Sequence, residues 1–249
     1  MERTMAERLT AEFVGTFTLI FIGAGSIIAM QTFGVGAVGI IGIAIAHGLA
    51  IGTMVTAVGH VSGAHFNPAI TIGAWITQKI KSSAAVAYIV TQLAGGTAGA
   101  LMLRASLPKR VVETAAYGVP AVITGLSNGQ AVLIEFILTF FLVWVVFASA
   151  IDPEGAFNKV AGLAIGFVIT MDILMGGFFT GAAMNPARHF GPALVGGKWN
   201  GWWVYWVGPV AGAIVAAALY DGLIIKRPGS VAADEVPHGV GAHGEDTTA

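Results

Sequence analysis

Residues 62–69 read SGAHFNPA, and residues 180–187 repeat the pattern as TGAAMNPA. In both copies an asparagine stands directly before a proline, and each copy follows a long apolar run. An asparagine side chain can cap a helix, and a proline at the first helical position loses only an N–H that has no helical partner. One copy would indicate an ordinary capped helix. Two copies at matched places in the two halves predict a paired site.

The composition indicates a protein that crosses a membrane several times. Of the 249 residues 56% are hydrophobic and 10% charged, and the mean hydropathy is +0.81. Soluble domains carry about 25% charged residues. The net charge of −1 gives no indication of a nucleic-acid partner. The absence of cysteine excludes disulfides, thiolate catalysis and cysteine-based metal centres.

Six apolar runs are long enough to cross a hydrocarbon core of roughly 30 Å. The first is followed by no small-residue cleavage site, so we read it as a retained span and not as a signal peptide. Two shorter runs begin at the repeated motifs, and a helix of about 11 residues covers only half the core. These two segments must be re-entrant, because half-helices cannot expose their backbone N–H groups to lipid. The predicted spans are 9–30, 35–58, 84–103, 130–150, 160–177 and 202–225, and the half-helices are 67–78 and 185–197.

The two halves also match outside the motif. Residues 12–17, EFVGTF, correspond to residues 135–140, EFILTF. Because each repeat has three spans, the second must enter the membrane from the opposite side, and inverted repeats place their site at the midplane. We therefore predict an all-α membrane protein with six transmembrane helices, two re-entrant half-helices and an inverted 3+3 repeat. The predicted organisation is a cytoplasmic N-terminus (1–8), a channel domain (9–226, with repeats 9–103 and 130–226) and a disordered cytoplasmic tail (227–249).

Lysine and arginine set the expected orientation. With both termini in the cytoplasm, seven basic residues lie on the inner side and four on the outer side, counting Arg188 separately. We expect a multi-pass protein of the cell (plasma) membrane with the lipid bilayer as its surroundings.

The paired motifs predict a pore for neutral molecules. Two half-helices that meet by their N-termini bring two positive dipole ends to one point, which repels cations. Asparagine amides there can orient a passing water molecule and break the chain of proton transfer. The motif residues of this predicted site are Asn67, Pro68, Ala69, Asn185, Pro186 and Ala187.

Several other polar residues lie in apolar surroundings. An arginine at depth is costly, so Arg188 is expected in a polar lumen; a side chain that reaches the outer interface is the alternative. Glu12 and Glu135 open the two halves, and we expect them to accept backbone N–H groups of the loops before the half-helices. His65 is grouped with them as a structural polar residue. A proton relay is the alternative, but only Asp172 adds another intramembrane acid.

Glycines spaced four residues apart predict close helix crossings, since small residues let helix backbones approach each other. These pairs are Gly48/Gly52, Gly95/Gly99, Gly162/Gly166 and Gly208/Gly212.

The two Asn-Pro-Ala boxes, with Arg188 directly after the second, resemble the aquaporin (major intrinsic protein) family over roughly residues 8–226. The resemblance implies a homotetramer with one pore per subunit. It also implies an outer constriction, or selectivity filter, made by His47, Ile173, Ala182 and Arg188. We expect no cofactor and no metal.

This filter is similar to that of plant tonoplast intrinsic proteins, although Asp172 stands where they usually have Asn, and loop 104–129 lacks the histidine that some of them carry. Ala193, Tyr205 and Trp206 match the water-channel pattern, whereas His189 fits neither the water nor the glycerol pattern.

The expected function is a passive channel for water and ammonia or other small neutral solutes that excludes protons and ions. A histidine has an ordinary pKa of about 6.5, so His47 predicts a dependence on external pH. The alternatives are a strictly water-selective channel or a glycerol/urea facilitator. An enzyme is not expected, because no Ser/His pair, Asp pair or metal triad shares a depth. A structural junction protein and an ion channel are the other rivals.

Overall fold

In the part of the chain that the structure describes, six long helical segments surround two half-helices that enter from opposite ends of the molecule. The computed structural model describes residues 3–155 and 158–225, so the predicted tail 227–249 lies outside the described residues. In these two ranges all regular structure is helical. The long segments are Met5–Thr32 (α1, Met5–Thr18, continued by a π-helical turn and by α2, Gly25–Thr32), α3 (Gly39–Ser62), α5 (Ser82–Ser106), α7 (Asn128–Val146, extended by a π-helical turn to Ile151), α8 (Ala161–Gly176) and α10 (Val204–Leu223).

Five of these segments are long and apolar enough to cross a membrane. The sixth, α8, has 16 residues and is therefore about 24 Å long at 1.5 Å per residue. It lies where the sequence predicts the span 160–177. The other predicted spans fall on the five longer segments, with ends that differ by a few residues.

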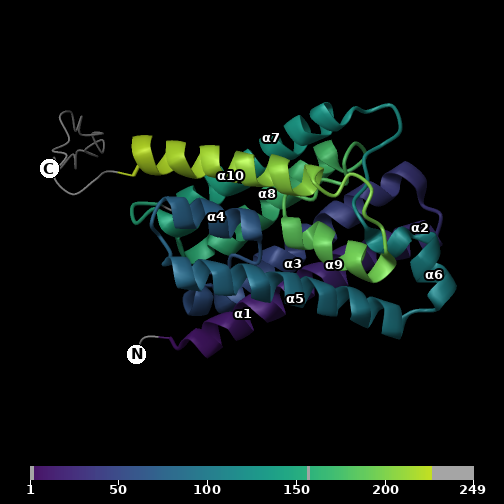
Figure 1. Cartoon of the computed structure of the whole chain (residues 1–249), viewed down its shortest axis with the longest axis horizontal. Coiled ribbons are helices and arrows are strands. Elements are labelled where there is room, and N and C mark those ends of the chain that lie inside the picture. Colours follow the sequence, from purple (N-terminus) through teal and green to yellow (C-terminus); the bar gives the residue numbers. More distant parts are fainter. Residues whose placement is uncertain (1–2, 156–157, 226–249) are drawn as a thin grey trace, which may run out of the picture.

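The half-helices are α4 (Pro68–Ile76) and α9 (Pro186–Gly196). In both, the proline occupies the first helical position, and the preceding asparagine accepts a hydrogen bond from the backbone two residues on. In Figure 1, α4 lies towards the end at which α1 begins and α10 ends, whereas α9 lies towards the opposite end. This arrangement is the predicted inverted repeat.

The link between the two halves is more structured than a loop. Residues 104–129, predicted to lie outside the spans, contain the short helix α6 (Lys109–Thr114) and a 3-10 turn at Ala116–Gly118. Figure 1 shows α6 beside α2 at the end away from the start of α1. We call this the α6 end of the molecule, and the other the α1 end.

Glycines allow the long helices to cross closely, as predicted. A Cβ atom at Gly52 would lie 2.8 Å from the carbonyl oxygen of Gly162, and one at Gly166 would lie 2.7 Å from that of Gly48. The same holds for α5 against α1, where a Cβ at Gly95 would lie 2.6 Å from the oxygen of Phe13. Within a bilayer such contacts stabilise helix pairs by van der Waals packing, because lipid leaves no hydrophobic gain from their association.

Candidate functional site

The loops that precede the two half-helices have the same backbone conformation. Three matched pairs of residues have positive φ angles that agree within 8°, although four of these six residues are not glycine. Non-glycine residues in this left-handed region are uncommon. The pairs are Gly63 and Gly181 (86° and 85°), Ala64 and Ala182 (51° and 43°), and Phe66 and Met184 (50° and 52°).

A buried glutamate holds each loop in this shape. Glu12 accepts hydrogen bonds from the backbone N–H groups of His65 (2.9 Å) and Phe66 (2.7 Å). Glu135 accepts the equivalent bonds from Ala183 (2.9 Å) and Met184 (2.7 Å). Both glutamates are fully buried, so these bonds satisfy donors that no water reaches.

Hydroxyl groups complete the same pattern in both halves. Ser62 donates to Glu12 over 2.7 Å, and Thr180 donates to Glu135 over 2.6 Å. A tyrosine from the last helix of each half then donates to the carbonyl of that same residue: Tyr88 to Ser62 (2.8 Å) and Tyr205 to Thr180 (2.9 Å). The glutamate, the loop and the third helix of each repeat are thus bonded into one unit.

The two asparagines meet across the interface of the repeats. The amide nitrogen of Asn67 donates to the carbonyl of Met184, and that of Asn185 donates to the carbonyl of Phe66, both over 2.9 Å. Their side-chain oxygens cap their own helices at Ala69 (2.8 Å) and Ala187 (2.9 Å). Each amide nitrogen keeps a second N–H that these bonds do not use.

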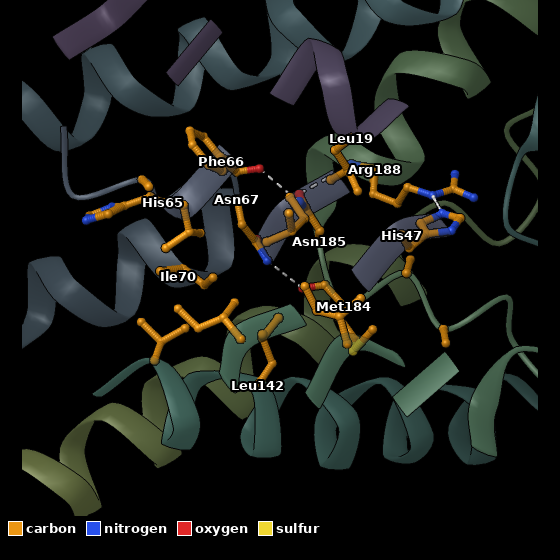
Figure 2. A pocket seen from close by; sticks show the side chains of 18 of the residues that line it. Leu19, His47, His65, Phe66, Asn67, Ile70, Leu142, Met184, Asn185 and Arg188 are labelled. Atoms are coloured by element: carbon orange, nitrogen blue, oxygen red, sulfur yellow. Dashed lines mark hydrogen bonds between the residues drawn. The ribbon is translucent and has the colours of Figure 1, made fainter. Parts of the chain in front are cut away.

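A narrow cavity of about 40 Å³ runs past these asparagines. It holds room for a few water-sized molecules. In Figure 2, His65 lies towards one end, Asn67 and Asn185 lie in the middle, and His47 and Arg188 lie at the other end. The remaining wall is largely aliphatic and includes Leu19, Ile51, Val55, Ile70, Leu142 and Ile169.

Arg188 is anchored at the α6 end of this cavity. It is 2% exposed, its Nε donates to Nε2 of His47 (3.2 Å), and its Nη1 donates to the carbonyl of Gly118 (3.0 Å). Its Nη2 has no hydrogen-bond partner within residues 3–155 and 158–225. The arginine lines the cavity as well as a second pocket that opens on the α6 side, so it lies between the two.

Both ring nitrogens of His47 are in use. Nδ1 lies 2.8 Å from the carbonyl oxygen of Ile43, and Nε2 accepts the bond from Arg188. This is the pattern of a neutral imidazole that carries its proton on Nδ1. A second proton on Nε2 would point at the guanidinium, so the pH dependence expected from His47 conflicts with this geometry.

The other two residues of the predicted filter, Ile173 and Ala182, are apolar. Both line the central cavity, and they are 3% and 4% exposed. All four predicted filter residues therefore lie together. His65 lies at the α1 end of the same cavity, where its Nδ1 is 3.1 Å from the hydroxyl of Thr71.

Asp172 and His189 stand next to predicted filter residues in the sequence but do not line the cavity. Asp172 is 1% exposed, and its Oδ2 has no hydrogen-bond partner in the described part of the chain, so it does not pair with a donor near Arg188. His189 stacks on Tyr205 with ring centroids 4.4 Å apart. Neither ring nitrogen of His189 has a partner among the described residues.

The sequence did not point to two residues that contact His47 and Arg188 of the predicted filter. Gly118 supplies the carbonyl that holds Arg188, and a Cβ at Gly23 would lie 2.5 Å from Nε2 of His47. Gly23 belongs to the π-helical turn Leu19–Ala24. A π-helical turn inside an α-helix frequently marks a functional site, but no sequence pattern predicted this one.

Taken together, the inverted repeat and the lined cavity between its half-helices define a membrane channel and not an enzyme. The chain belongs to the major intrinsic protein family, that of the aquaporins, whose pattern matches residues 2–220.

Plant aquaporins are among its similar relatives. Aquaporin TIP1-2 of Zea mays is 41% identical over 90% of this chain and 88% of its own length. Aquaporin NIP1-4 of Oryza sativa subsp. japonica is 43% identical over 89% of this chain and 78% of its own length. These relatives give no support to the plasma-membrane placement that the sequence suggested.

The fold is that of a solved channel. The aquaglyceroporin from Plasmodium falciparum aligns with a TM-score of 0.78 over 89% of this chain and 97% of its own, at 24% identity. This confirms the predicted architecture of the chain.

Proposed function

We propose that the chain is a passive pore for water and ammonia that excludes protons and other ions. The observation that carries this proposal is the crossed pair of amide hydrogen bonds at Asn67 and Asn185. These bonds fix both side chains at the middle of the cavity and leave one N–H on each for a passing molecule. A water whose oxygen accepts from these donors cannot also accept a proton along the file, which opposes proton leakage.

Positive charge at two depths supports exclusion of cations. Each half-helix N-terminus carries roughly half an elementary charge, and both N-termini meet at the asparagines. Arg188 adds a full charge at the α6 end, where it is held by Gly118 and His47. A cation would meet both barriers in a cavity whose remaining wall is aliphatic.

The polar groups of the constriction support passage of ammonia. Only Arg188 offers an unused donor there, because both nitrogens of His47 are occupied and Ile173 and Ala182 are apolar. A filter with few partners replaces little of a permeant's hydration. The resulting loss of hydration costs ammonia less free energy than water, since ammonia is the more weakly hydrated molecule.

Stopped-flow light scattering on proteoliposomes tests the proposal, with water, ammonia, urea and glycerol gradients in parallel and a pH-sensitive dye inside the vesicles. We expect water and ammonia flux above that of protein-free vesicles, without proton flux. A proton flux that rises with water flux would contradict it.

A strictly water-selective pore is the second candidate. It is favoured by the two anchors on Arg188, which keep the constriction from widening. Ammonia flux equal to that of protein-free vesicles would select it, and glycerol flux would select a glycerol/urea facilitator instead.

We also propose a homotetramer with one pore per subunit and both termini in the cytoplasm. The family membership supports the homotetramer. The sequence pattern supports the cytoplasmic termini, because seven basic residues are expected on the inner side and four on the outer side. Cross-linking of the detergent-solubilised protein and protease access to each terminus in oriented vesicles test these two statements.

A further inference from the structure

A pocket at the α1 end, distinct from the pore, is lined by four basic side chains. Arg3 lies just before α1 and Arg8 lies near its start, and Lys79 and Lys81 come from the link between α4 and α5. The pocket has a volume of about 670 Å³ and is open to the surroundings. We call it the basic pocket.

The positive charge of the basic pocket is only partly balanced. Arg3 lies 3.5 Å from Glu7, and Lys79 lies 2.7 Å from Asp221. Lys81 forms no ion pair with a carboxylate of the described residues, and neither does Arg8. Four cations with two carboxylates leave a surplus of two positive charges.

Arg8 is held in place in the wall of the basic pocket. Its Nε donates to the hydroxyl of Tyr88 (2.7 Å), and its guanidinium carbon lies 5.2 Å from the centre of that ring. Tyr88 is fully buried and bonded to Ser62, so the guanidinium is fixed before any ligand arrives. Its two Nη groups make no hydrogen bond to the described residues and can form the paired bonds that suit a phosphate.

The position of the pocket indicates where that phosphate comes from. Both α1 and α5 begin at the pocket and continue as membrane-spanning segments, so it lies at the level of lipid headgroups. Ser83 lines the pocket, and one helical face of α5 continues from it through Val86 and Val90, which are 55% and 61% exposed. An acyl chain can follow this apolar face away from the pocket.

We propose that the basic pocket binds the phosphate headgroup of an anionic phospholipid from the leaflet at the α1 end. Arg8 contacts the phosphate, Arg3 and Lys81 supply the surrounding charge, and Val86 and Val90 contact an acyl chain. Clusters of basic residues next to membrane-spanning helices attract anionic lipids in this way.

The test is lipid retention by the full-length protein in native mass spectrometry, with phosphatidylglycerol and phosphatidylcholine compared at equal concentration. The variant is Arg3→Gln/Lys81→Gln, because both side chains are exposed and lie outside the packed core. The matched control is Lys109→Gln/Arg110→Gln, which removes the same charge on α6 at the opposite end.

We expect wild type and control to prefer phosphatidylglycerol, and the variant to bind it about thirtyfold more weakly, at about fivefold per cation. Equal retention of the two lipids by wild type would overturn the proposal, as would equal losses in variant and control. A third arm adds glycerol 3-phosphate: if this soluble headgroup displaces phosphatidylglycerol at equal concentration, the acyl chain is not recognised and the lipid assignment is wrong.

Discussion

Asn67 and Asn185 each donate a hydrogen bond to the backbone of the opposite repeat, and both bonds measure 2.9 Å. The acceptors are the carbonyls of Met184 and Phe66, the residues directly before the partner asparagines. Because each asparagine also caps its own half-helix, one side chain fixes a helix start and the distance between the two halves at the same time. The amide group is therefore required both for structure and for the proposed exclusion of cations.

The first prediction concerns Asn185→Asp. A carboxylate keeps the capping oxygen but loses the N–H groups, and its negative charge offsets the positive helix ends. We expect water flux to persist and a measurable cation or proton flux to appear in dye-loaded proteoliposomes. The control is Asn128→Asp, an exposed position in the first turn of α7. Ion flux in the control but not in Asn185→Asp would contradict the role assigned to the amide.

The second prediction concerns Glu135→Gln. In the wild type, the N–H groups of Ala183 and Met184 and the hydroxyl of Thr180 share the two carboxylate oxygens of Glu135. The variant leaves these three donors a single carbonyl oxygen. Loss of a charged acceptor in a buried site costs about 1–3 kcal/mol. We expect a lower midpoint of thermal unfolding in detergent, compared with Glu113→Gln on the exposed side of α6. An unchanged midpoint would show that the loop does not depend on the charge.

The third prediction is insensitivity to mercuric salts. The chain has no cysteine, and a thiolate is the group through which mercury blocks a pore. Water flux should be unchanged by mercuric chloride, while Ala182→Cys should create inhibition that a thiol reverses, because Ala182 lines the cavity. Thiol-reversible inhibition of the wild type would show that another side chain binds mercury.

The repeated motif was enough to predict the half-helices, and the matching segments 12–17 and 135–140 were enough to predict the two glutamates, because each signal lies within one short segment. The arrangement of the predicted filter residues depends on contacts that no local pattern encodes. Gly118 and Arg188 are 70 residues apart, and the π-helical turn that brings Gly23 to His47 has the same apolar composition as its neighbours. Asp172 was recognised as unusual, but among the described residues its Oδ2 has no hydrogen-bond partner that would explain it.

The fourth prediction concerns Gly23→Ala. The new methyl group would lie 2.5 Å from Nε2 of His47, the atom that accepts the bond from Arg188, so the ring must move. One such hydrogen bond contributes about 1 kcal/mol, and a change of that size in a barrier corresponds to about fivefold in rate. We expect a change of that size in water flux, with no change for Gly129→Ala, where the added carbon meets no atom within 4 Å. Equal effects of the two substitutions would exclude a positioning role for Gly23.

The last prediction concerns the apolar side of the constriction. Ile173 lines both the central cavity and the pocket on the α6 side, so a molecule that moves between the two is expected to pass it. Ile173→His adds a polar ring that offers water another partner and narrows the opening, so ammonia flux should fall more than water flux. His47→Phe removes the acceptor of the Arg188 Nε bond and should change the same ratio, since Arg188 then has only Gly118 to hold it.

Both variants are compared with Ile123→His, a substitution at a half-exposed position outside the cavity lining. Ammonia uptake is measured in proteoliposomes and in yeast that lack their own ammonium transporters. Because a generally damaged pore loses water and ammonia together, the decisive quantity is the ratio of the two fluxes. A ratio left unchanged by Ile173→His and His47→Phe would mean that these side chains do not set selectivity, and that the resistance to ammonia lies deeper in the cavity, at the asparagines.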